Sequence, residues 1–201
     1  MKVLVACEFS GIVRDAFIKL GHDAMSCDLL PTERSGPHYQ GDVRDILGNG
    51  WDMMIAHPPC TYLANSGVQY LHKQPGRWQK MKDARDFFML LYNAPIERVC
   101  VENPLPHRYA ELPAYSQIIQ PFMFGDEASK RTCLWLQDLP PLLPTKIVGK
   151  GERYIGKNGK PNGSMWYQMA ICAPKNDRWK IRSRTFQGIA DAMAMQWGGV
   201  V

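Results

Sequence analysis

Short apolar runs alternate with helical patterns in the first half of the chain. Val3 to Cys7 is a continuous apolar run typical of a buried strand. Ile12, Ala16, Phe17 and Leu20 then recur at helical spacing until Gly21, which predicts a helix that ends there. The same reasoning predicts strands at 22–28, 51–56 and 98–101, and a helix at 77–92. This alternation predicts an α/β fold with a mostly parallel sheet.

The second half has a different pattern. Apolar runs at 118–124, 132–136 and 164–172 predict three strands with no long helix between them. A final helix is predicted from Thr185 to Trp197, with Ile189, Met193 and Trp197 on one stripe. The length of 201 residues fits a single domain.

Composition excludes several classes of protein. With 45% hydrophobic and 21% charged residues, the chain has the composition of a folded protein and not of a disordered one. Its longest apolar run is far shorter than the roughly 20 residues of a membrane-spanning helix. Glu8 interrupts the N-terminal apolar run too early for a secretion signal. We therefore expect a cytoplasmic protein with no membrane association.

The six cysteines are scattered, without a CxxC pair or clustered histidines, so neither a metal site nor a disulfide framework is expected. Four of them lie in or at the end of apolar runs, where a thiol usually fills the core: Cys7, Cys100, Cys133 and Cys172.

The net charge of +5 is unevenly distributed. Residues 145–184 contain ten Lys or Arg and only two acidic residues, whereas residues 1–144 carry slightly more acidic than basic groups. Trp166, Tyr167 and Trp179 are interleaved with these cations, a composition suited to phosphate contacts and base stacking. A solvated basic loop is the alternative interpretation.

Polar residues follow the first predicted strands. Glu8 to Gly11 form a turn into a helix, whose N–H groups could face a ligand anion. Asp28 ends the second strand about 20 residues later, where such folds place an acid on ribose hydroxyls, and Gly41-Asp42-Val43 follows. Together these residues predict a nucleoside site.

Two further strands end in residues suited to catalysis. Residues 51–56 lead into His57-Pro58-Pro59-Cys60, where two prolines hold the thiol in a rigid loop. Residues 98–101 lead into Glu102-Asn103-Pro104, which puts a carboxylate at the same edge of the sheet. A Cys and Glu pair could serve amide hydrolysis only with a His base, and His57 and His107 are better interpreted as surface or structural residues.

These motifs, in this order, resemble those of the cytosine-5 DNA methyltransferases, including the small versions common in bacteriophages and prophages. The resemblance covers roughly residues 3–136 and is carried by Phe9-Ser10-Gly11, Asp28, Gly41-Asp42-Val43, Pro58-Pro59-Cys60, Glu102-Asn103-Pro104 and Lys130-Arg131-Thr132. It implies a Rossmann-like, S-adenosylmethionine-dependent methyltransferase fold and a function in DNA methylation, such as protection from restriction. It also implies a single catalytic domain with a cofactor and catalytic core (1–136), a short basic insertion (137–181) and a C-terminal helix that packs back on the core (182–201).

The resemblance implies a role for each matched residue. Cys60 would be the nucleophile that adds to carbon 6 of cytosine, while Glu102 contacts ring nitrogen 3. Lys130 and Arg131 would support the base and a phosphate. S-adenosylmethionine would be held by Phe9, Ser10 and Gly11 at its methionine part, by Asp28 at the ribose, by Asp42 at the adenine, and by Pro58.

The chain also departs from the family pattern. Val13 and Arg14 stand where the family has a second glycine, and Ile189 replaces an asparagine. The family's recognition region has a hundred residues or more, whereas residues 137–181 number only about 45. We expect this segment to grip phosphates with little base selectivity, or to recognise a very short site. A duplex substrate would have to be flipped out, with Tyr62, Trp166 or Tyr167 filling the gap.

The favoured hypothesis is therefore a DNA (cytosine-5-)-methyltransferase that is a monomer. Two alternatives stay open: the same chemistry on free deoxycytidine nucleotides or RNA, and a non-catalytic nucleic-acid binder. An amino-group methyltransferase is disfavoured, because its motif needs an aromatic residue where Cys60 stands.

Overall fold

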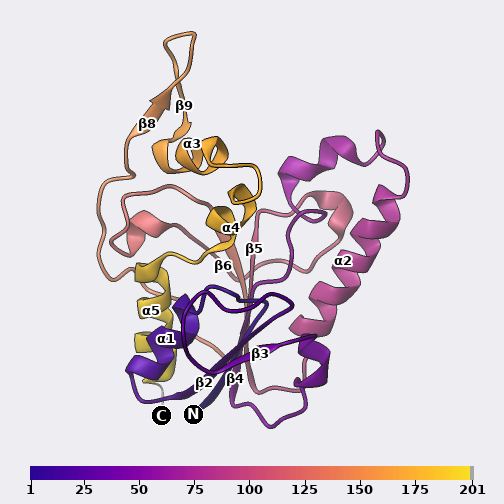
Figure 1. Ribbon diagram of the computed structural model, residues 1–201, viewed down its shortest axis with the longest axis vertical. Helices are drawn as coiled ribbons and strands as arrows, with labels where there is room; N and C mark the ends of the chain where they lie inside the picture. The colour runs from indigo at the N-terminus through magenta and orange to yellow at the C-terminus, as the bar shows by residue number, and fades with distance from the viewer. Residues whose placement is uncertain (200–201) are drawn as a thin grey trace.

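A seven-stranded sheet forms the centre of the computed structural model, which describes residues 1–199 (Figure 1). The strand order is β3-β2-β1-β4-β5-β7-β6. Strands β1 to β5 are parallel, and β7 is antiparallel to both β5 and β6. The strands are β1 (Lys2–Ala6), β2 (Asp23–Asp28), β3 (His38–Gln40), β4 (Met53–Ala56), β5 (Arg98–Pro104), β6 (Gln117–Ile119) and β7 (Thr132–Gln137). The predicted Rossmann-like, mostly parallel fold is confirmed.

Helices cover both faces of the sheet. α1 (Ile12–Lys19) and α5 (Gln187–Gly198) lie on one face, and α2 (Arg77–Tyr92) lies on the other (Figure 1). Alternate residues of a strand point to opposite faces. Val3 and Val5 accordingly join the cluster under α1 and α5, whereas Leu4 and Ala6 join the cluster under α2.

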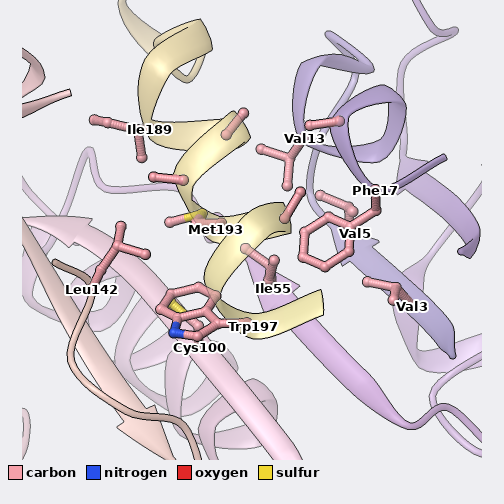
Figure 2. Packing of buried hydrophobic residues seen from close by; sticks show 14 of the residues in the cluster. Val3, Val5, Val13, Phe17, Ile55, Cys100, Leu142, Ile189, Met193 and Trp197 are labelled. Carbon is pink, nitrogen blue, oxygen red and sulfur yellow. The ribbon is translucent and has the colours of Figure 1, made fainter. Parts of the chain in front are cut away.

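The cluster under α1 and α5 brings together elements from the two ends of the chain. Val13 and Phe17 of α1 and Met193 and Trp197 of α5 belong to one buried cluster on this face of the sheet, in which the Trp197 ring lies beside Cys100 (Figure 2). All four are fully buried. The predicted C-terminal helix therefore exists, and its last turn carries a core residue. Residues 200 and 201, the end of the 182–201 segment, lie outside the described residues.

The prediction for 164–172 is wrong, because this segment is the helix α3 (Met165–Cys172). Ser164 caps it, since its hydroxyl accepts a hydrogen bond from the Tyr167 N–H at 3.2 Å. Cys172, expected in the core, is exposed.

The strand predicted at 118–124 is also too long, because β6 ends at Ile119 and Pro121 begins a 3-10 turn, η4 (Pro121–Met123).

The segment between β7 and α5 extends beyond the sheet. It contains the hairpin of β8 (Arg153–Ile155) and β9 (Pro161–Ser164), then α3 and the short helix α4 (Arg178–Ser183). The hairpin projects from the rest of the molecule at the top of Figure 1. Three further 3-10 helices lie in the loops: η1 (Val43–Asp45), η2 (Asn65–Tyr70) and η3 (Arg108–Ala110). Across residues 1–199, every helix is too short or too polar to span a bilayer.

Close backbone packing fixes the start of α5. The Gly188 N–H donates to the Asp126 carboxylate at 3.0 Å, and a Cβ at position 188 would overlap the Phe124 carbonyl oxygen. At the other end of the helix, the Trp197 indole N–H donates to the Pro140 carbonyl at 3.0 Å. Glycine at 188 therefore allows the helix to approach the loop after β6.

We predict that Gly188→Ala lowers the free energy of unfolding by about 1–3 kcal/mol, the cost typical of overpacking. The overlap is with backbone and cannot be relieved by a side-chain rotation. Denaturant unfolding measures the change. Gly48→Ala is the matched control, because nothing lies within 4 Å of a Cβ at that position. Equal stability of the two variants would contradict this account of α5 packing.

Candidate active site

The ends of β4 and β5 place His57 beside Glu102. The parallel register pairs Ala56 with Val101, so the next residue of each strand lies at the same level. His57 Nδ1 lies 3.2 Å from Glu102 Oε2, and the two side chains are only 7% and 16% exposed. Of the two interpretations offered for His57, surface or structural residue, the surface one is excluded, because the side chain is buried against Glu102.

The neighbours of Glu102 favour the ionised form of its carboxyl group. Burial alone would raise the pKa of this carboxyl, but the His57 hydrogen bond, the positive charge of Lys130 and the Thr132 hydroxyl outweigh it. The pKa of Glu102 is consequently below its usual value. A buried, ionised carboxylate thus stands at the carboxyl end of the sheet.

The loop that carries Cys60 is fastened to the segment after β5. The Asn103 amide donates to the Pro58 carbonyl at 3.0 Å, which ties the start of the loop to the strand that carries Glu102. Further contacts hold the residues after Cys60: Asn65 N–H to Leu105 O at 3.1 Å, His107 N–H to Leu63 O at 3.0 Å, and His107 Nε2 to Tyr62 O at 3.2 Å. These hydrogen bonds fix the loop that carries the Cys60 sulfur to β5 and the segment that follows it.

Charges of both signs surround the Cys60 thiol. Burial and the Glu102 carboxylate raise the pKa of Cys60, whereas Lys130 and Arg182 act in the opposite direction, and the net shift is upward. Cys60, Glu102 and Lys130 therefore share one electrostatic environment. Glu102 and Lys130 line one pocket, and the charges of both act on the Cys60 thiol.

Lys130 connects this site to residues 145–184, which contain the ten cations and are called the basic segment below. Its ammonium donates to the Arg182 carbonyl at 3.1 Å, at the end of α4. Lys130 and Glu102 also line a small pocket whose other walls are Thr132, Thr185, Phe186, Ile189 and Met193. The start of α5 therefore forms part of the wall beside Glu102.

Arg131, the fourth predicted catalytic residue, lies elsewhere. It is exposed and lines an open groove together with Ala64, Asn65, Ser66, Pro104, Leu105, Gln120 and Ser129. Lys130 and Arg131 therefore line different pockets, although they are adjacent in sequence.

Glu8 occupies the N-terminus of α1. Its buried carboxylate accepts hydrogen bonds from the Val13 N–H at 2.8 Å, the Arg14 N–H at 3.3 Å and the Ser10 hydroxyl at 3.0 Å. The expectation that these N–H groups are free for a ligand anion is therefore wrong. A carboxylate of the chain itself already satisfies them.

Arg14 fills the space beside Gly11. The side chain is fully buried, and its guanidinium donates to the Ser26 hydroxyl at 3.1 Å and to the carbonyls of Arg34 and Ser35 at 3.1 and 3.2 Å. A Cβ at Gly11, which has a φ of +71°, would collide with this guanidinium. The departure from the family's glycine thus has a structural role, because Arg14 anchors the segment after β2.

Acidic groups gather at the ends of β1 and β2. Cys7 has a left-handed backbone with a φ of +58°, and it is partly buried and packs against the hydrophobic cluster under α2. Burial raises the pKa of Cys7, and the nearby charges of Asp28 and Asp42 raise it further. Asp28 accepts from the Leu30 N–H at 3.0 Å. Asp42 caps η1 and pairs with Arg44 at 2.8 Å.

The predicted methionine-binding loop is covered by the basic segment. Phe9 and Ser10 are buried, and the Phe9 ring lies 5.5 Å from the Trp179 ring of α4, measured between centroids. Arg184 forms a double hydrogen bond with Glu33 at 2.8 and 2.7 Å, and the Glu33 N–H donates to the Phe9 carbonyl at 2.8 Å. Helix α4 therefore contacts Phe9 through Trp179 and Lys130 through the Arg182 carbonyl.

The sequence interpretation missed two residues of this site, His57 and Arg182. The parallel register of two adjacent strands would have placed His57 beside Glu102. Arg182 gave no comparable signal, because it is one of ten cations in its segment. Within residues 1–199, no group of three or more His, Cys, Asp or Glu is arranged to hold a metal ion.

No protein-family model and no curated protein matches the sequence. Among solved structures, the chain is similar to a protein described as a DNA modification methyltransferase encoded within a prophage of E. coli, with a TM-score of 0.47 and 14% identity over 73% of this chain and 51% of that one. It is also similar to the Entamoeba histolytica methyltransferase EhMeth, with a TM-score of 0.43 and 16% identity over 75% of this chain and 56% of that one. A third similar structure is the S. pombe Dnmt2 methyltransferase, with a TM-score of 0.43 and 15% identity over 84% of this chain and 58% of that one. The chain thus spans between half and three fifths of the length of these proteins.

We predict that the stability advantage of wild type over Glu102→Gln depends on pH. Because the pKa of Glu102 is lowered in the folded state, its charge stabilises the fold at pH values above the pKa of an unfolded glutamate. That contribution is lost as the pH falls through the lower, folded-state pKa. Denaturant unfolding of both proteins at several pH values measures it. A difference that stays constant from neutral to acidic pH would contradict the assignment.

Proposed function

We propose that this protein transfers a methyl group from S-adenosylmethionine to carbon 5 of cytosine in DNA, through a covalent adduct with Cys60. The observation that carries the proposal is that Glu102 and Lys130 line one pocket at the carboxyl edge of the parallel sheet, next to the Cys60 loop, which the Asn103 amide ties to the strand of Glu102. Ligands of such sheets bind at this edge. A soft nucleophile beside a carboxylate suits reversible addition to a pyrimidine ring.

In this mechanism the Cys60 sulfur bonds to carbon 6 of the ring and the thiol proton passes to ring nitrogen 3, which makes carbon 5 electron-rich. The raised pKa of Cys60 means that the resting group is the thiol, and the charges of Lys130 and Arg182 favour the thiolate that must form. After methylation, carbon 5 gives its proton to solvent water, the electron pair of that bond expels the sulfur, and the proton on nitrogen 3 returns to the sulfur. The adduct thus returns the free cysteine.

Glu102 would stabilise the charge that the addition places on the ring. A proton on ring nitrogen 3 neutralises that charge, and the ionised Glu102 carboxylate accepts a hydrogen bond from the resulting N–H. His57, as the Nδ1–H tautomer, donates to Oε2 and so fixes the orientation of the carboxylate. We therefore assign His57 as a positioning residue.

The residues at the ends of β1 and β2 fit the nucleoside part of S-adenosylmethionine. The carboxylates of Asp28 and Asp42 would accept hydrogen bonds from the ribose hydroxyls and the adenine amino group, and Phe9, Ser10, Gly11 and Pro58 would complete the site. When bound, the cofactor supplies a methyl group on a positively charged sulfur. The α1 N–H groups held by Glu8 take no part in binding its carboxylate.

The basic segment would supply the contacts to the nucleic acid. Its ten cations favour backbone phosphates, and α4 places Arg182 near Cys60. In this proposal residues 1–136 form the catalytic core, residues 137–181 the reduced recognition region, and residues 182–201 the closing segment. Arg131 would bind a phosphate from its separate groove, without touching the reacting base.

Cys60→Ser should lower methyl transfer by several orders of magnitude, because an alcohol is a far weaker nucleophile than a thiolate. Transfer of labelled methyl from S-adenosylmethionine to plasmid DNA measures this loss. Cys172→Ser is the control, since Cys172 is an exposed free thiol far along the chain. Parallel assays with a deoxycytidine nucleotide and with RNA test the two alternative substrates.

Covalent trapping adds a second measurement for Cys60. An oligonucleotide that carries 5-fluorocytosine should form a stable adduct with wild type and none with Cys60→Ser, because fluorine cannot leave carbon 5 as a proton does. Turnover close to wild type in Cys60→Ser would refute the nucleophile. Cofactor binding without transfer or trapping in wild type would favour a non-catalytic binder.

His57→Ala should lower kcat about 10- to 100-fold with little change in KM, as expected for one buried hydrogen bond to a charged group. His57→Asn should restore part of kcat, because an amide N–H can replace Nδ1–H as donor. The steady-state constants and the pH dependence of kcat measure the effect. If His57→Ala retained wild-type kcat, its role would be confined to packing.

A further inference from the structure

Three large aromatic side chains are exposed on the lobe that follows Cys60. We define the aromatic lobe as residues 61–80 together with residues 107–109, which include η2, the start of α2 and the start of η3. Within it, Trp78, Tyr109 and Tyr70 are 37%, 38% and 40% exposed. Tryptophan is highly buried on average, so an exposed tryptophan grouped with two exposed tyrosines calls for an explanation.

The rings form a connected surface. The Trp78 ring stands edge-on to His72 at 5.3 Å and to Tyr109 at 5.6 Å, measured between centroids. Tyr109 also lies 6.1 Å from the His107 ring, and His107 contacts the Cys60 loop through the Tyr62 carbonyl. The exposed rings are thereby held in place and linked to the loop that carries Cys60.

Cations are interleaved with these rings. The Arg77 guanidinium lies 4.9 Å from the Tyr62 ring and 5.3 Å from the Tyr70 ring, and it donates to the Thr61 carbonyl at 3.2 Å. Arg108 lies 4.9 Å from the Tyr109 ring. Residues 61–82 contain four Lys or Arg and no acidic residue. The lobe is therefore an aromatic surface of positive charge and not an apolar patch.

The position of the lobe relates it to the proposed site. It begins at Thr61, the residue after Cys60, and lies beside α2, across the sheet edge from α3 and the β8-β9 hairpin (Figure 1). A polynucleotide with one base at Cys60 would therefore have neighbouring nucleotides close to this surface.

We infer that the aromatic lobe binds unpaired nucleotides of a single strand, stacking their bases on Trp78 and Tyr109 while the exposed Arg108 and Lys80 face the phosphates. Exposed rings interleaved with cations are the usual features of single-strand binding surfaces. The faces of bases in an intact duplex are already covered by their neighbours, so this surface discriminates in favour of unpaired strands. The choice of a nucleic acid as ligand rests on the proposed function.

The test is binding of a fluorescent oligothymidine of about twelve nucleotides to the full-length protein, followed by fluorescence anisotropy without cofactor. Trp78→Ala and Tyr109→Ala should each weaken binding about tenfold or more, and Trp78→Phe should retain most of it. The matched control is Tyr115→Ala, which removes an aromatic ring of equal exposure, 39%, outside the lobe. An abasic oligonucleotide of the same length should bind all these proteins alike, because it offers phosphates but no bases.

Photocrosslinking of an iodouracil oligonucleotide to the wild-type protein gives a readout that needs no variant. Crosslinks at Trp78 or Tyr109 would support the inference, and crosslinks confined to residues 145–184 would overturn it. Unchanged binding in both alanine variants, or an equal loss of duplex binding, would also overturn it. Because the assay involves no turnover, a protein without methyltransferase activity could still bind through this lobe, and an active enzyme could lack the binding.

Discussion

The parallel pairing of β4 with β5 is the constraint on which the candidate site depends. Its register sets His57 level with Glu102, and the Asn103 amide one residue later holds the Pro58 carbonyl. Both strands are buried, so a slip of one residue would bury the polar ends and expose core side chains. The pairing of these buried strands is therefore what places the Glu102 carboxylate beside His57 and ties the Cys60 loop to the same strand.

The basic segment is integrated with this site and is not a separate appendage. Trp179 packs on Phe9, Arg184 pairs with Glu33, and the Arg182 carbonyl accepts from Lys130. These contacts join the loop after β1 to the pocket beside Glu102. A segment with a high positive charge is thereby held over the carboxyl edge of the sheet, where the charge can act on a bound polyanion.

Local sequence patterns predicted the regular elements well. The helix at 77–92 matches α2 at both ends, and the apolar run from Val3 falls in β1. The run at 164–172 failed because its residues are apolar on every side, which leaves no periodicity to separate a helix from a strand, and Ser164 as an N-cap was the overlooked signal. The site was only partly predictable. Strand ends located Cys60 and Glu102, but the capping of α1 by Glu8 and the left-handed Cys7 depend on tertiary contacts.

The buried Arg14 has a consequence for how this chain can vary. Side chains at Gly11 or Gly36 would each collide with its guanidinium, which also donates to the Ser35 carbonyl. Positions 11, 14 and 36 therefore form one interdependent unit, in which an arginine at position 14 demands glycine at positions 11 and 36. A glycine at position 14 alone would leave a hole in which the Ser35 carbonyl has lost this donor, so the three positions could be exchanged only together with the turn around them.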